Sequence, residues 1–233
     1  MALRSNLREG ASEDALRAFL HAPENSRRFR LLLPEFRGRA RLHDEPFLSR
    51  FSYGGSTFAE RDARAASHVQ ALLNQVVDIG NVTVEGATAP IDHQAIAFLF
   101  GSRSNKATQA ILEQLRTTLF QFDFTDTWAV ICKGQRFSLR DPTVLAPPAY
   151  EASDDYGVIA RLGSAGPTPV FVIAGLGGRA TEGCGLYFRE HWDEMDREYG
   201  TQDFAVVLRF PAPFDVDRVE RAASACEPPR FGL

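Results

Sequence analysis

The 233-residue sequence predicts an α/β fold, in which a mostly parallel sheet carries helices on both faces. Three observations support this prediction. Residues 94–101 (QAIAFLFG) and 169–175 (PVFVIAG) are continuous apolar runs that end in glycine. Each run is followed by a segment with helical periodicity. Continuous rather than alternating hydrophobicity is typical of strands that are covered on both faces, as in a parallel sheet.

The first half of the chain is predicted to begin with an N-terminal helical arm over residues 1–25. Residues 31–33 predict a first strand, and a second strand is expected between residues 76 and 84. Thr57 and Glu60 have the spacing of a capping box. The helix that they would open carries apolar residues at intervals of about 3.6 residues, so one of its faces is expected to pack on the sheet.

The second half continues the same alternation of strands and helices. Further strands are predicted at residues 127–139 (two strands around a turn), 155–163 and 203–210. A helix is expected after the second apolar run, where apolar and aromatic residues from Cys184 to Tyr199 recur on one side. The main α/β domain therefore covers residues 26–212, and the Pro-rich residues 213–233 are predicted to be a tail that wraps the surface.

The composition is that of an ordinary globular protein, with 44% hydrophobic and 24% charged residues. No apolar run reaches about 18 residues, so we expect neither a membrane span nor a membrane partner. The first residues lack the apolar stretch of a secretory signal, and the three cysteines lack the spacing of a zinc site. We therefore expect a cytoplasmic protein without a metal ion.

The charge pattern argues against nucleic acid as a partner. The formal net charge is −4, so a general electrostatic attraction to nucleic acid is not expected. One exception is local, because arginines crowd into residues 27–41. These arginines fit either a phosphate-binding segment or a surface strand and loop with solvated charges.

Small polar residues follow the first buried strand, at the start of a predicted helix. This loop contains Ser102, Arg103, Ser104, Asn105 and Lys106. In open α/β sheets, ligands bind beyond the carboxyl ends of the strands, where helix N-termini point. Free amides and hydroxyls there can hold an anion, and Arg103 or Lys106 can add positive charge. The alternative is plain N-capping of the helix by Ser104 or Asn105.

A second loop of this kind follows the other buried strand. It contains Gly175, Gly177, Gly178, Arg179 and Thr181. Its spacing matches GxGxxG/A between a strand and a helix, as in dinucleotide-binding folds. The acidic residue that such folds place about 20 positions further on is missing, so ordinary NAD binding is not favoured. The loop either contacts a ligand or is a tight turn whose glycines permit close packing of helix and sheet.

The candidates for catalysis are three carboxylates, Glu182, Asp155 and Glu60. Glu182 lies just after the second glycine loop, where one acid can stabilise an oxocarbenium ion. Asp155 and the acid before it start a strand, and at most one of two adjacent acids points inward. Cys184 and His191 lie about 10 Å apart along one helix, too far for a nucleophile–base pair. Packing roles are therefore predicted for both of them.

The order of the 101–105 loop, the DYGVI strand and the 175–181 loop resembles Rossmann-like sensor and effector domains of prokaryotic signalling and defence proteins. This group includes TIR, SLOG and nucleoside deoxyribosyltransferase-like domains. The resemblance covers about residues 28–210 at the level of element order. It implies a Rossmann-like three-layer sandwich and a nucleotide-derived ligand, with or without turnover. By position, Glu182 is closest to the catalytic glutamate of such domains, and Glu60 comes next.

The sequence leads to one main hypothesis and two alternatives. The main hypothesis is a regulatory or sensor domain that binds a nucleotide-like or phosphate-bearing small molecule at the two loops, without another cofactor. The first alternative is an NAD or nucleotide hydrolase of the N-glycosidase type. The second is a protein-interaction module, as a homo-oligomer or in a larger assembly, that docks through the arginine-rich segment or the last helix. The interface residues of that helix would be Tyr187, Trp192, Met195 and Tyr199.

All three hypotheses assume the predicted α/β fold, and the main hypothesis also depends on where two of its loops lie. The loops after Phe100 and Ala174 must leave one edge of the sheet side by side.

Overall fold

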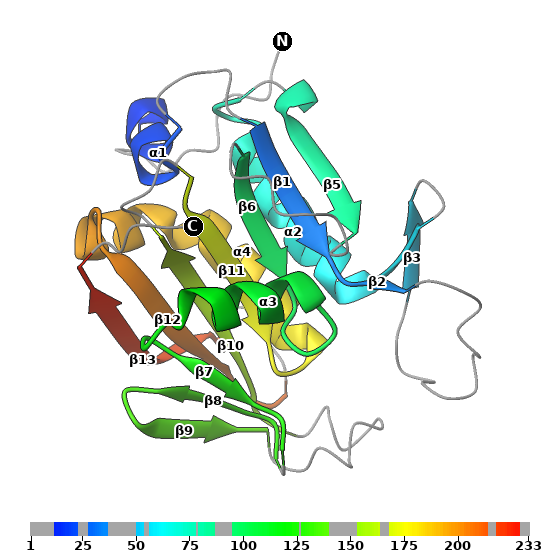
Figure 1. Cartoon of the computed structure of the whole chain (residues 1–233), viewed down its shortest axis with the longest axis vertical. Coiled ribbons are helices and arrows are strands. Elements are labelled where there is room, and N and C mark those ends of the chain that lie inside the picture. Colours follow the sequence, from blue (N-terminus) through cyan, green and yellow to red (C-terminus); the bar gives the residue numbers. More distant parts are fainter. Residues whose placement is uncertain are drawn as a thin grey trace.

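The computed structural model describes residues 12–22, 28–36, 50–53, 56–77, 79–86, 95–125, 127–139, 153–163, 168–213 and 218–228. The strands of its main sheet are β1 (Arg28–Leu33), β5 (Val82–Gly86), β6 (Ala95–Phe100), β10 (Asp155–Leu162), β11 (Val170–Gly175), β12 (Asp203–Phe210) and β13 (Glu220–Glu227). They lie in the order β13–β12–β10–β11–β6–β1–β5 (Figure 1). The predicted α/β class is confirmed.

The main sheet is mixed, because two of its strands run against the others. β6 pairs in parallel with β1 and β11, and β1 pairs in parallel with β5. β10 runs antiparallel to both β11 and β12, and β13 runs antiparallel to β12. The start of β10 therefore lies at the edge where β11 and β12 end, with Asp155 opposite Phe210 and Gly157 opposite Gly175.

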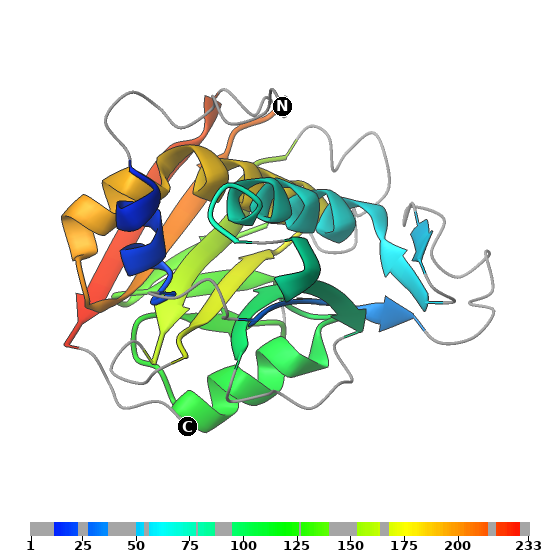
Figure 2. The same cartoon turned by 90° about the horizontal axis from the view of Figure 1, so that it is seen from above.

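Helices cover both faces of the sheet (Figure 2). One face carries α1 (Glu13–Phe19), α2 (Glu60–Leu73) and α4 (Gly178–Tyr199). The other carries α3 (Lys106–Leu115) and a small antiparallel sheet of β7 (Gln121–Asp123), β8 (Ala129–Cys132) and β9 (Gln135–Ser138). On the α4 face, the rings of Phe98 and Phe171 stack with centroids 4.7 Å apart, and Phe188 meets them edge-on. This aromatic layer holds α4 on the sheet.

The last helix packs on the sheet through the residues that one hypothesis assigned to an interface. Tyr187, Trp192, Met195 and Tyr199 of α4 are all buried in the core. They are therefore core residues of this chain, and this side of α4 is not an exposed docking surface. No helix in the described part of the chain is long and apolar enough to span a membrane.

Two local predictions differ from the structure. Residues 213–233 were predicted to be a tail, yet Glu220–Glu227 form β13 at the edge of the main sheet. Thr57 does not cap α2, because it lies in β4 (Ser56–Ala59) of a second small sheet. The other strands of that sheet are β2 (Glu35–Phe36) and β3 (Arg50–Tyr53), and a short 3-10 helix η1 (Ile79–Asn81) precedes β5. The N-cap of α2 is Ala59, which has no side-chain cap. Four of the six arginines of the arginine-rich segment, Arg27, Arg37, Arg39 and Arg41, lie outside the described residues.

Candidate functional site at the carboxyl edge of the sheet

The two predicted loops leave the sheet side by side, as the main hypothesis requires. The backbone N–H of Gly101 donates to the carbonyl of Ile173, at 3.1 Å. The hydroxyl of Ser102 donates to the carbonyl of Gly175, at 2.6 Å. These bonds join the loop after β6 to the end of β11. The starts of β10, α2, α3 and α4 lie at this same edge.

In the loop after β6, the buried polar groups hold the backbone. The amide nitrogen of Asn105 donates to the carbonyls of Leu32 and Phe100, at 3.0 and 2.7 Å. The side-chain oxygen of Asn105 accepts from the N–H of Thr108, at 3.0 Å, and so caps α3. Ser102 is also buried, whereas Arg103, Ser104 and Lys106 are exposed. The three exposed side chains are the part of this loop that a ligand can reach.

In the loop after β11, the backbone amides already bind a carboxylate of the protein. Asp155 accepts from the N–H groups of Tyr156, Gly177 and Ala180, at 2.8, 3.0 and 3.2 Å. The start of α4 thus holds an internal anion, which its helix dipole stabilises. Because β10 is antiparallel, Asp155 reaches the edge at which the sequence placed an external anion. The amides of Gly177 and Ala180 therefore already have an acceptor within the protein.

The glycines after β11 are closely packed, as expected if the loop is a tight turn that brings helix and sheet together. A Cβ atom on Gly175 would lie 2.4 Å from the backbone nitrogen of Thr181 and 2.5 Å from the carbonyl oxygen of Gly177. The hydroxyl of Thr181 accepts from the N–H of Gly175, at 3.0 Å. Gly178 approaches the side chain of Arg61 in α2, and Arg179 is buried. The glycines therefore permit the first turn of α4 to sit directly on the end of β11.

The most unusual acid at this edge is Asp62, which sequence reasoning missed. It lies in the first turn of α2, and one of its oxygens would be 3.2 Å from a Cβ atom on Gly101. Burial raises the pKa of Asp62 to about 7, although a hydrogen bond with Thr181 lowers it in part. A signal was present, because Asp62 shares a helical face with the buried Ala66 and Val69.

The three predicted catalytic acids have other partners. Asp155 binds the start of α4, as described above. Glu182 forms ion pairs with Arg61 and Arg64 of α2, and Arg64 also pairs with Glu60, at 2.5 Å. These ion pairs join the starts of α2 and α4.

Cys184 and His191 have packing environments, as predicted. Burial raises the pKa of the Cys184 thiol well above its ordinary value, and a Cβ atom on Gly157 would lie 2.4 Å from the sulfur. His191 stacks on Tyr187, with ring centroids 4.1 Å apart. Among the described residues, no group of three or more His, Cys, Asp or Glu side chains is placed to hold a metal ion.

The evidence for function comes from the geometry at the carboxyl edge of the sheet. No protein-family model, curated protein or solved structure matches the chain. The carboxyl edge offers two distinct chemical features. One is a pair of exposed cations, Arg103 and Lys106, on an anchored loop. The other is the buried carboxyl of Asp62, between the end of β6 and the start of α4.

Proposed function

We propose that the chain is a regulatory or sensor domain that binds a nucleotide-like or phosphate-bearing small molecule at the carboxyl edge of β6 and β11. The observation that carries this proposal is the junction of the two loops by the Ser102–Gly175 hydrogen bond. It places the exposed Arg103 and Lys106 beside the ends of two neighbouring parallel strands, the usual location of ligands in open α/β sheets.

Side chains rather than the α4 amides would hold the phosphate in this proposal. Asp155 binds the amides of Gly177 and Ala180, so a second anion there would meet a like charge. Arg103 lies instead in the loop that leads into α3, and Lys106 is the first residue of α3, on the other face of the sheet. Charge-assisted hydrogen bonds from a guanidinium and an ammonium group are well suited to a phosphate. We therefore locate the ligand on the α3 side of the edge.

The experiment that tests this function is thermal unfolding with a panel of nucleotides and sugar phosphates. A ligand that binds the folded state raises the melting temperature by mass action. The double variant Arg103→Glu/Lys106→Glu should lose this rise. The matched control is Arg116→Glu/Arg197→Glu, which changes the charge equally at two exposed arginines elsewhere. Unchanged stabilisation of the first variant, or no stabilisation by any compound, would contradict the proposal.

A second candidate function is hydrolysis of an N-glycosidic bond in NAD or a nucleotide, in which the carboxyl of Asp62, buried in the chain without ligand, would be uncovered when the substrate binds and would then act as the acid or base. General acid–base catalysis works best when the pKa lies near the working pH, and the pKa of Asp62 is about 7. The test is product formation from NAD and nucleosides, which Asp62→Asn should abolish. The control is Glu182→Gln, because Glu182 is ion-paired with α2. Absence of turnover on the whole panel would exclude this function.

A further inference from the structure

A row of aromatic rings leads from the core to the carboxyl edge. Phe120, Phe122, Phe124 and Trp128 form consecutive ring pairs with centroid distances of 5.6, 5.8 and 5.9 Å. Phe120 is buried, whereas the other three rings are half-buried. The row thus ends in a tryptophan that keeps part of its surface in contact with solvent.

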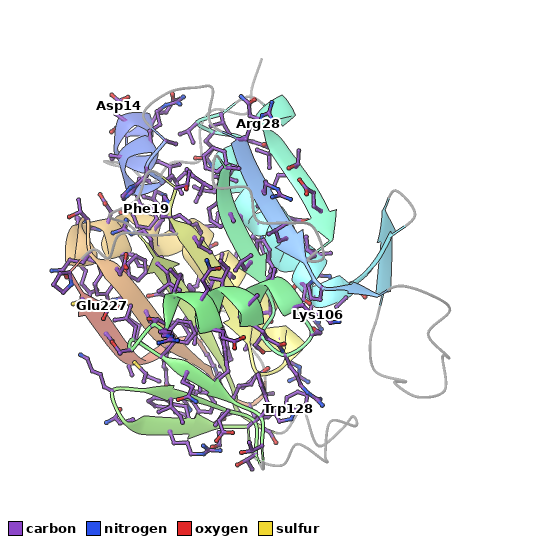
Figure 3. The ribbon with its side chains drawn as sticks, in the orientation of Figure 1. Asp14, Phe19, Arg28, Lys106, Trp128 and Glu227 are labelled. Atoms are coloured by element: carbon purple, nitrogen blue, oxygen red, sulfur yellow. The ribbon has the colours of Figure 1, made fainter. Side chains whose placement is uncertain are left out.

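The end of this row is covered by a cation from the ligand loop. The guanidinium of Arg103 lies 4.8 Å from the centroid of the Trp128 ring, a cation–π contact. The backbone of Arg103 is anchored, because the side-chain amide of Gln109 donates to its carbonyl at 2.6 Å. In Figure 3, the labelled Lys106 lies at the start of α3 and the labelled Trp128 lies below it. The loop after β6 and the β7–β8 connection therefore meet at an arginine–tryptophan pair.

The small sheet holds Trp128 in a defined position. The N–H of Leu139 donates to the carbonyl of Trp128, at 2.9 Å. Beside it, Arg136 donates to the carboxylate of Asp123 at 2.6 Å and to the carbonyl of Thr127 at 3.1 Å. These bonds tie the β7–β8 connection to β9 at both of its ends. These backbone and side-chain hydrogen bonds therefore fix the position of the Trp128 backbone, from which the indole ring extends.

We propose that Trp128 and Arg103 form a stacking site for the nucleobase of a nucleotide whose phosphate is bound near Lys106. This inference rests on the proposed function and specifies its ligand class. The guanidinium of Arg103 lies over the indole in the chain without ligand, so a flat heteroaromatic ring that stacks there takes its place, and the planar guanidinium then lies against the other side of the base. The positive charges of Arg103 and Lys106 complement the phosphate of the same molecule. A ribose phosphate without a base satisfies the cations but leaves the indole face unused.

The experiment uses the fluorescence of the tryptophans, of which the chain has two, Trp128 and Trp192. Trp192 is buried in the core, so the variant Trp192→Phe leaves Trp128 as the emitting residue. AMP, GMP, CMP and UMP are titrated into it, with ribose 5-phosphate as the ligand without a base. Calorimetry on the unaltered chain measures the affinities. If Trp192→Phe does not fold, the unaltered chain is compared with Trp128→Phe instead.

Stacking predicts that the nucleotides quench the emission of Trp128 and that ribose 5-phosphate does not. Trp128→Ala should weaken nucleotide binding by about tenfold or more and leave ribose 5-phosphate unaffected. The control is Phe137→Ala, which removes another half-buried ring of the small sheet and should change neither affinity.

Three results would overturn the inference, and they separate it from the proposed function. If ribose 5-phosphate binds as tightly as the nucleotides without quenching, the site recognises phosphate alone and only the stacking site is wrong. If nucleotides bind Trp128→Ala as tightly as the unaltered chain, the base lies elsewhere. If none of the five compounds binds, the proposed function and the stacking site are both wrong.

Discussion

Asp62 illustrates how tertiary contacts change the chemistry of a single residue. An acid in the first turn of a helix is ordinarily a solvated group that complements the helix dipole. Here the ends of β1 and β6 enclose it, with Pro34 and Gly101 at the same point, and Thr181 of α4 supplies a hydrogen bond. Loss of solvation is the largest influence and raises its pKa to about 7.

The raised pKa of Asp62 predicts that the contribution of this residue to the stability of the protein falls as the pH rises. Between about pH 4 and pH 7, Asp62 is protonated in the folded state and ionised in the unfolded state, whose pKa is near 3.8. The folded state then binds more protons, so the free energy of unfolding falls by about 1 kcal/mol per pH unit. Asp62→Asn should remove this part of the slope and stabilise the protein at pH 8.

Urea unfolding at pH 5, 6, 7 and 8 measures this effect. Glu113→Gln, which neutralises an exposed carboxyl on α3, is the control and should keep the slope of the unaltered chain. An identical slope in Asp62→Asn would show that Asp62 is ionised in the folded protein throughout this range.

Asp155 is predicted to be a structural anion whose removal costs stability. Its carboxylate accepts three backbone N–H groups and is only 2% exposed. Asp155→Ala leaves the N–H groups of Gly177 and Ala180 without this acceptor, so we expect a loss of about 2 kcal/mol. The neighbouring Asp154→Ala is the control, because Asp154 is half-buried and should cost less. Equal losses in urea unfolding would contradict the special role of Asp155.

At the scale of elements, the contact between α2 and α4 positions the candidate site. A Cβ atom on Gly185 of α4 would lie 2.7 Å from both Cα and the carbonyl oxygen of Ala65 in α2. The two helices therefore touch through their backbones at this point. This close approach keeps Asp62 against Thr181 and Arg61 against Glu182.

Gly185→Ala is therefore predicted to separate the two helices. A backbone cannot yield as a flexible side chain does, so we expect a loss of about 1–3 kcal/mol despite the better helix propensity of alanine. Gly80→Ala is the control, because a Cβ atom there would meet nothing within 4 Å. Thermal unfolding measures both variants. An unchanged or higher melting temperature of Gly185→Ala would show that α2 and α4 can move apart without cost.

At the scale of the whole molecule, hydrophobic runs predicted the class of the fold but not the direction of every strand. β6 and β11 were recognised because both are wholly buried. Burial on both faces does not indicate the direction of a strand, because a wholly buried strand has the same continuous apolar pattern whether it runs parallel or antiparallel to its neighbours. The length of the connection between β10 and β11 did indicate direction. Its seven residues, between Leu162 and Val170, are too few for the crossover that two parallel neighbouring strands need, so these two strands must be antiparallel. The position of Asp155 at the candidate site follows from this one reversal.

The sequence predicted the position of the two loops of the candidate site, because the order and direction of the strands determine it, but it did not predict the side-chain contacts there. The two loops could be placed at one edge because parallel neighbouring strands end together. The occupation of the α4 amides by Asp155 and the burial of Asp62 depend on residues far apart in the chain, which no local pattern reports. The Trp128–Arg103 pair was missed for the same reason, because it joins the small sheet to the loop after β6.

β13 provides a test of the architecture as a whole. It has few large apolar residues, because it lies at the edge of the sheet, and the sequence therefore suggested a tail. In the structure it pairs with β12 from Asp203 to Arg209.

A chain that ends at residue 213 would leave β12, which is rich in buried apolar residues, as an unprotected edge. We expect this truncated chain to aggregate or to melt at least about 10 °C lower. A chain that ends at residue 228, which keeps all of β13, is the control and should melt like the full chain. If the shorter chain is monomeric and equally stable, β13 does not belong to the cooperative fold, and residues 213–233 are the tail that the sequence predicted.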